Sequence, residues 1–287
     1  MCAHAGSDGP TPGPRAAGRY GEDVFPPDLV GEGDRIDLGA LAYDDVTMAR
    51  LRELGIGPGR HCLDLGAGTG TVSRRLLREE HVDSVLAVDR DVRFLTARPV
   101  PGLDVMEADI TAPDFDPGRR FHLVHARFVL MHLPDRPRLI SSLTRLLLPG
   151  GVLVISDAVD PNHAVDPNHD AGADATPYTR VMRAMWQGLR DTIGTDVSRI
   201  TDHPHLLRSA GLVRVGAEIR VPPLLPASPI SRFWADTWNR ARAAIVATGQ
   251  VDDATVDAAI AYLDSPDCAD LSAGMITAWG WRAPMPE

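Results

Sequence analysis

Three glycines with one acid before them form the first candidate site in the sequence. Gly66, Gly68 and Gly70 follow an apolar run that contains Asp64, and a helical pattern begins at 71. This order predicts a strand, a tight turn and a helix. At such a turn the N–H groups of the helix N-terminus are exposed, and glycine has no side chain to keep a ligand away. We therefore expect the polar part of a ligand to lie against the main chain here.

The spacing of the glycines restricts what this ligand is. A dinucleotide-binding turn requires its third glycine where this chain has Thr71, which disfavours a nicotinamide oxidoreductase. A phosphate-binding loop requires a lysine after its last glycine, but all 29 basic residues are arginine. The lack of lysine also excludes covalent chemistry through a side-chain amine.

Two further acids follow neighbouring predicted strands. Asp89 ends the strand predicted at 84–88, where a carboxylate can accept hydrogen bonds from both hydroxyls of a ribose. Asp109 comes shortly after the strand predicted at 103–106. The alternatives are that Asp89 caps the helix predicted to begin at 91 and that Asp109 lies in a solvated turn.

These residues together resemble a known family. The acid with its G-x-G-x-G turn, the segment 124–135 and the Leu-Leu-Pro-Gly-Gly sequence at 147–151 are similar to motifs of class I S-adenosylmethionine-dependent methyltransferases. The resemblance is to bacterial enzymes that methylate small molecules in particular, and it covers residues 20–160. It implies S-adenosylmethionine as the cofactor and S-adenosylhomocysteine as the product.

The resemblance also implies roles for individual residues. Asp64 would hold the amino end of the cofactor, Asp89 its ribose, and Asp109 its adenine amino group, with an apolar neighbour over the ring. His125 and Ala126 would line the sulfonium end, and Arg127 would lie close by or form an ion pair at the sheet edge. The implied cofactor-binding residues are Asp64, Gly66, Ala67, Gly68, Gly70, Asp89, Arg90, Asp109, Ile110, His125, Ala126 and Arg127.

Three histidines are the catalytic candidates, because histidine is the usual general base at neutral pH. His132 follows the fourth predicted strand near the expected methyl group, and it is the first choice. His163 and His169 end two copies of a Val-Asp-Pro-Asn-His sequence after the fifth strand. A capping or core role is the alternative for each. The duplicated sequence contains metal-ligand types, but Pro-Asn favours turns, so no metal site is expected.

Predicted strands and helices alternate along the chain. Apolar runs indicate strands near 60–65, 84–88, 103–106, 121–125, 152–155, 212–221 and 275–281. This order predicts an α/β fold with a doubly wound, Rossmann-like, seven-stranded and mostly parallel sheet. The resemblance adds an antiparallel last strand and a helical cap.

Two predicted helical segments have end signals in the sequence. The segment 37–54 reads as one helix or two, with Leu38 and Leu41 among its apolar positions, and the segment 136–148 reads as one helix that Pro149 would end. A third helix, near 177–193, places Met182, Met185 and Trp186 on one stripe that suits either a core or an apolar pocket.

The chain divides into five predicted parts. They are a disordered tail at 1–19, an N-terminal arm with lid helices at 20–58, a cofactor-binding core at 59–157, a helical substrate-side insert at 158–211, and strands and helices at 212–287 that complete the sheet.

Composition narrows the partners. The formal net charge of −10 argues against nucleic acid, which requires a basic surface. No apolar run approaches the length of a membrane span. The three cysteines form no disulfide or zinc pattern, and no signal peptide is recognised, so we expect a cytoplasmic location. A homodimer stays open.

The leading hypothesis is therefore a methyltransferase that moves a methyl group from S-adenosylmethionine to an O, N or C atom of a small molecule, such as a secondary metabolite. Two alternatives keep the cofactor. One is an enzyme that uses it to organise a cyclisation, decarboxylation or hydroxylation, and the other is a non-catalytic cofactor-binding module.

Overall fold

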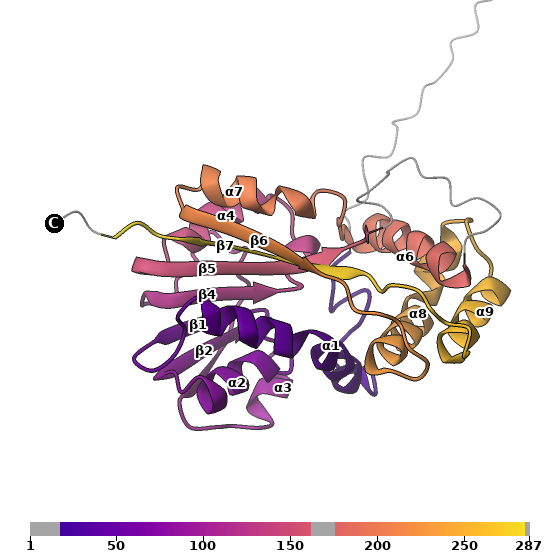
Figure 1. The fold of residues 1–287 in the computed structure, drawn as a ribbon, viewed down its shortest axis with the longest axis horizontal. Helices are drawn as coiled ribbons and strands as arrows, with labels where there is room; N and C mark the ends of the chain where they lie inside the picture. The colour runs from indigo at the N-terminus through magenta and orange to yellow at the C-terminus, as the bar shows by residue number, and fades with distance from the viewer. Residues whose placement is uncertain (1–17, 162–175, 285–287) are drawn as a thin grey trace, which may run out of the picture.

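The computed structural model describes residues 18–161 and 176–284, and it contains one seven-stranded sheet (Figure 1). The strand order is β3-β2-β1-β4-β5-β7-β6. The first five strands run parallel, and β7 is antiparallel to both of its neighbours. The predicted fold class is confirmed. The strands are β1 His61–Leu65, β2 Ser84–Asp89, β3 Leu103–Glu107, β4 Phe121–Arg127, β5 Leu147–Val159, β6 Val213–Arg220 and β7 Gly274–Trp281.

The centre of the sheet is buried on both faces. In β1, β4 and β5 successive residues are buried rather than alternate ones, which is why these strands read as continuous apolar runs. Cys62 belongs to this core and is fully buried, as predicted. β6 lies at the edge of the sheet and is largely exposed.

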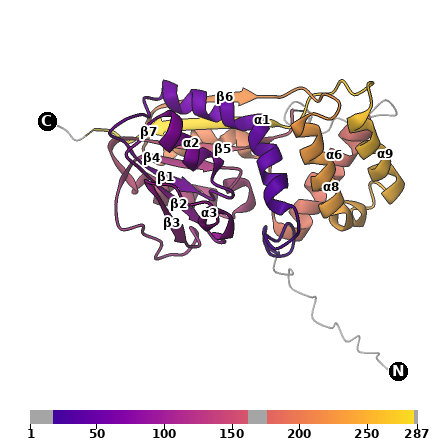
Figure 2. The same ribbon diagram turned by 90° about the horizontal axis from the view of Figure 1, so that it is seen from below.

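Helices cover both faces of the sheet, and further helices lie beyond one end of its strands (Figure 1). Two helices, α2 and α3, lie on one side, and two others, α4 and α7, lie on the other. We call α6, α8 and α9 the helical layer, and α1 runs from the sheet to this layer (Figure 2). The helices are α1 Glu32–Glu53, α2 Thr71–Glu79, α3 Arg93–Thr96, α4 Arg136–Thr144, α6 Pro177–Ile193, α7 His203–Ser209, α8 Pro229–Ala247 and α9 Asp253–Asp264, with short 3-10 helices η1 at Leu130–His132 and η2 at Ile200–Asp202.

Local sequence explains where the helices of this layer begin. Thr176 and Ser228 each cap a helix whose first residue is proline, and Asp252 accepts from the Thr255 N–H at 2.9 Å. The layer combines α6, from the predicted insert, with α8 and α9, from the predicted C-terminal part. None of the described helices is long and apolar enough to cross a membrane.

Two predicted helix limits are wrong. The first helix begins at Glu32 rather than at 37, and Leu41 is 68% exposed instead of lying on the apolar face. The buried face of α1 is partly polar instead: Arg35 donates to the Thr237 hydroxyl of α8, and the Tyr43 hydroxyl donates to the Ala273 carbonyl. The helix expected to run to 148 ends at Thr144, because Leu147 pairs with Phe121 and so begins β5.

A histidine and an aspartate are buried together beneath α7. His203 Nε2 lies 2.8 Å from Asp157 Oδ2, and both side chains are fully buried. Asp157 is in β5 and His203 begins α7, so this contact fixes the helix to the sheet.

We predict that His203→Ala destabilises the fold by about 3 kcal/mol, because it leaves the Asp157 carboxylate buried without its partner. Urea unfolding measures this free energy. His205→Ala on the same helix is the control, because His205 is exposed. Equal stabilities of the two variants would contradict the assignment.

Candidate functional site

One cavity of about 690 Å³ lies where the carboxyl ends of the central strands meet the helices. The turn after β1 and residues that follow β2, β3 and β4 line one end of it. Residues 20–25, α1, α6 and α8 line the other end, which we call the acceptor end. In doubly wound sheets, ligands bind at this edge of the sheet.

The glycine turn needs its glycines for two physical reasons. Gly66 and Gly68 have φ angles of 61° and 56°, in the left-handed region that glycine favours. A Cβ on Gly66 would also lie 2.3 Å from Val129 Cγ2, whereas the nearest atom to one on Gly68 is Ile36 Cγ2 at 3.6 Å. Packing therefore excludes a side chain at Gly66, while at Gly68 the backbone faces the open cavity.

The Asp64 carboxylate joins three elements under this turn. Its Oδ2 accepts from the Ser73 hydroxyl at 2.6 Å, and its Oδ1 lies 2.8 Å from His125 Nδ1. Asp64 and His125 are register partners in β1 and β4, which brings the two side chains together. His125 is 1% exposed, and no described residue offers a partner to its Nε2.

Asp89 connects the second strand to the glycine turn. Its carboxylate accepts from the Gly68 N–H at 2.8 Å and from the Asp91 N–H at 3.2 Å. Burial raises the pKa of Asp89, and these backbone hydrogen bonds oppose the rise. Arg90 lines the cavity but extends toward residues 18–25, where it donates to Glu22 at 3.0 Å and to the Tyr20 carbonyl.

Asp109 and Ile110 lie together on the cavity wall after β3. Asp109 accepts from the N–H and the hydroxyl of Thr111, and Arg19 lies 3.5 Å away. Partial burial alone would raise the pKa of Asp109, but the Thr111 hydrogen bonds and the Arg19 charge outweigh it and lower the pKa.

Arg127 forms an ion pair. Its Nη2 donates to Asp44 Oδ1 at 2.6 Å and its Nη1 to the Thr47 hydroxyl at 3.1 Å, so β4 is fixed to α1. The ion-pair alternative for this residue is therefore the one observed, although Arg127 still lines the cavity. Nine of the other predicted cofactor residues line the cavity too: Asp64, Gly66, Ala67, Gly68, Asp89, Arg90, Asp109, Ile110 and His125. Gly70 and Ala126 are not among its lining residues.

His132 is the one catalytic candidate that the structure describes. It lines the cavity, its Nδ1 lies 2.8 Å from the Thr195 hydroxyl, and its ring stacks on Tyr20 at 4.3 Å between centroids. His163 and His169, with the duplicated sequence, lie outside the described residues. Within 18–161 and 176–284, no group of three or more His, Cys, Asp or Glu residues could hold a metal ion.

The sequence interpretation missed a polar network at the acceptor end. Arg35 donates to both carboxylate oxygens of Glu32, to the Tyr20 hydroxyl at 2.8 Å and to the Thr237 hydroxyl at 3.2 Å. The only local signal was the spacing of Glu32 and Arg35, which places them on one face of a helix. Nothing local links Arg35 to Thr237, which lies on α8.

Several known proteins are similar to this chain in sequence or in fold. The family model described as "Methyltransferase domain" matches residues 42–215. Methyltransferase str3 of Strobilurus tenacellus is 28% identical over 196 residues, which cover 67% of this chain and 69% of that protein. Trans-aconitate 2-methyltransferase of Deinococcus radiodurans is 32% identical over 120 residues, but the match spans only 45% of that enzyme and 41% of this chain.

This chain belongs to the class I S-adenosylmethionine-dependent methyltransferases. Solved structures share the fold of this methyltransferase at low sequence identity. The YcgJ protein of Bacillus subtilis has a TM-score of 0.55 at 16% identity, with 83% of this chain and 98% of that one covered. Phosphoethanolamine N-methyltransferase 2 of Haemonchus contortus has a TM-score of 0.54 at 15% identity, with 90% and 59% covered.

The residues of the methyltransferase fit the family's cofactor, S-adenosylmethionine. The cavity contains a buried histidine nitrogen without a partner among the described residues, next to a carboxylate. It also contains a glycine whose missing side chain leaves backbone exposed to the cavity. A cofactor with an amino acid end and hydroxyls can use both features.

We predict that Gly66→Ala weakens S-adenosylhomocysteine binding at least tenfold, because the new Cβ would force the stiff Val129 side chain away from the turn. Isothermal titration calorimetry measures the dissociation constant. Gly59→Ala is the matched control, because Gly59 has a φ of 79° and no described atom within 4 Å of a new Cβ. If Gly59→Ala weakens S-adenosylhomocysteine binding as much as Gly66→Ala does, backbone strain alone is responsible and the clash with Val129 is not.

We also predict that His132 makes stability depend on pH. Burial and the charges of Arg35, Arg136 and Arg90 lower the pKa of His132 from 6.5 to about 3. Between about pH 3 and pH 6.5, His132 is therefore protonated in the unfolded chain but neutral in the folded one. The contribution of neutral His132 to the free energy of unfolding is complete above about pH 6.5 and is lost as the pH falls toward 3. Urea unfolding should show a smaller loss of stability between pH 7.5 and pH 5.5 in His132→Asn than in the wild type. The exposed His205→Asn should behave as the wild type, and equal losses in all three proteins would contradict the prediction.

Proposed function

We propose that this methyltransferase methylates an O, N or C atom of a small molecule that binds at the acceptor end of the cavity. One observation carries the proposal: a single cavity extends from the glycine turn to the helical layer. When bound, S-adenosylmethionine supplies a methyl group on a positively charged sulfur. A cavity of about 690 Å³ lies in the range of small-molecule sites.

The strand ends supply the groups for the cofactor. We assign Asp64, which Ser73 holds in place, to its amino acid end. His125 Nδ1 lies 2.8 Å from the Asp64 carboxylate, so we assign His125 to the same end, in place of the sulfonium end that the sequence suggested. We assign Asp89 to the ribose hydroxyls. Its hydrogen bond to the Gly68 N–H ties the ribose position to that of the turn. Asp109 and Ile110 are assigned to the adenine.

Positioning accounts for much of the catalysis in this proposal. Holding two reactive groups in line converts a bimolecular step into an effectively unimolecular one. We keep His132 as the catalytic candidate, and its lowered pKa makes it a neutral group that exchanges hydrogen bonds with the acceptor rather than a strong base. The choice of a secondary metabolite, the cytoplasmic location, the catalytic roles of His163 and His169, and a homodimer stay predictions from the sequence.

The test is binding of S-adenosylhomocysteine to the wild type and to Asp89→Ala. Saturating ligand should raise the melting temperature of the wild type by several degrees, since ligand at about 100 times its dissociation constant adds about 2.7 kcal/mol. Asp89→Ala should bind at least tenfold more weakly, because two hydrogen bonds to a charged group are lost. NADH should give no shift.

The matched control is Asp104→Ala, an exposed aspartate on β3 outside the cavity. It should bind S-adenosylhomocysteine as the wild type does. A wild type stabilised by NADH but not by S-adenosylhomocysteine would refute the proposed function. Unchanged affinity in Asp89→Ala would refute only the ribose assignment.

A further inference from the structure

The acceptor end of the cavity is rich in aromatic rings. The chain has five tryptophans, four tyrosines and six phenylalanines, and eight of these residues line the cavity. Several are in contact with one another, such as Phe233 with Trp234 at 4.8 Å and Tyr43 with Phe128 at 5.2 Å between ring centroids. Six of the eight lie at the acceptor end: Tyr20, Phe25, Tyr43, Trp186, Phe233 and Trp234. The other two, Phe94 and Phe128, follow β2 and β4 and line the other end.

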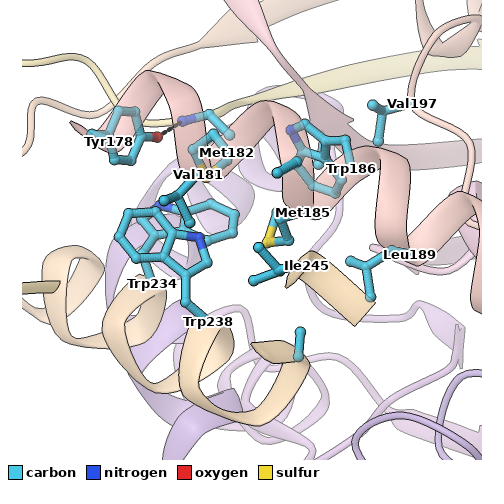
Figure 3. Close-up of a cluster of buried hydrophobic side chains, with 14 of the residues drawn as sticks. Tyr178, Val181, Met182, Met185, Trp186, Leu189, Val197, Trp234, Trp238 and Ile245 are labelled. Atoms are coloured by element: carbon cyan, nitrogen blue, oxygen red, sulfur yellow. Dashed lines mark hydrogen bonds between the residues drawn. The ribbon is translucent and has the colours of Figure 1, made fainter. Parts of the chain in front are cut away.

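Buried contacts between α6 and α8 hold part of this aromatic surface in place. Figure 3 shows Trp186 and Met185 of α6 beside Trp234 and Trp238 of α8. Trp238 is fully buried, and Trp234 donates its Nε1–H to the Ser272 hydroxyl at 2.8 Å. Trp186 contacts Trp234 edge to face, with 6.2 Å between the ring centroids. Rings fixed in this way offer flat apolar surface at little cost in conformational entropy.

The charged side chains at the acceptor end are already paired. Arg35 and Glu32, which are 3% and 2% exposed, share two hydrogen bonds, one of them at 2.9 Å. Arg240 lies 3.6 Å from Glu32 and 3.0 Å from Asp236. With the Arg127–Asp44 pair, the described residues of this wall leave no arginine or carboxylate without an opposite charge.

Aromatic rings also cover the guanidinium group of Arg35. Its central carbon lies 4.3 Å from the ring centroid of Phe25 and 5.4 Å from that of Phe233. An anionic ligand could reach this group only by displacing Glu32 or a ring. A charged ligand would lose its hydration here and find no free counter-charge, and such a transfer is costly.

We propose that the acceptor is a flat, uncharged aromatic molecule, and that the paired charges of the wall reject acceptors with a carboxylate or an ammonium group. This inference rests on the proposed function, because it takes the glycine-turn end of the cavity to be filled by the cofactor.

Three naphthalene probes of similar shape test the inference: 2-naphthol, which is neutral, 2-naphthoate, which is an anion, and 2-naphthylmethylammonium, which is a cation. Calorimetry at pH 7.5 with saturating S-adenosylhomocysteine gives their dissociation constants. 2-Naphthol should bind at least tenfold more tightly than either charged probe. Equal or tighter binding of a charged probe, or no binding of 2-naphthol, would overturn the inference.

Two variants make the test specific. Glu32→Gln removes the carboxylate that neutralises Arg35, so the ratio of the 2-naphthoate to the 2-naphthol affinity should rise at least tenfold. Phe233→Leu replaces one large apolar side chain with another, so the fold should be kept. It should weaken the binding of 2-naphthol about fivefold without changing the binding of S-adenosylhomocysteine. Phe115→Leu is the control, because Phe115 does not line the cavity.

The first titration separates the two possible failures. If S-adenosylhomocysteine does not bind to the wild type, the proposed function fails. If it binds and the three probes bind equally, or Phe233→Leu and Phe115→Leu have the same effect on 2-naphthol, the acceptor assignment alone is wrong.

Discussion

The buried Asp64 carboxylate is the contact on which the rest of the site depends. It accepts from Ser73 on α2 and holds His125 on β4, so one charged group fixes the helix after the glycine turn and the neighbouring strand. A buried carboxylate is costly unless polar partners surround it. This requirement holds the turn, the helix N-terminus and the His125 Nε2, which has no partner among the described residues, at the same end of the cavity.

Pairs of opposite charges hold the acceptor end of the cavity together in the same way. The Arg127–Asp44 pair attaches α1 to the sheet, and the hydrogen bonds of Arg35 attach the same helix to α8 and to the Tyr20 hydroxyl. Helix α1 therefore joins the part of the molecule that we assign to the cofactor to the part that we assign to the acceptor. These bonds pair the charged side chains at the acceptor end with one another. They therefore hold the helices of this wall together and leave no free charge on the described part of its surface.

How far the sequence predicted the structure depends on how local each signal was. The turn at Gly66, Gly68 and Gly70 was predictable because a strand, a turn and a helix follow one another within a few residues. Asp89 and Asp109 were predictable because strand ends share one edge of a parallel sheet. The start of β5 at Leu147 was not, because it depends on pairing with Phe121, a long-range contact. The partners of Arg35 were not either, because Thr237 is about 200 positions away in the sequence.

A crystal structure with S-adenosylhomocysteine bound would test the central claim most directly. We predict that the amino acid end lies within hydrogen-bond distance of Asp64 or His125, that the ribose hydroxyls bind Asp89, and that the acceptor end between α1, α6 and α8 stays free. A ligand that occupies the acceptor end, or that leaves Asp89 without contact, would contradict this account.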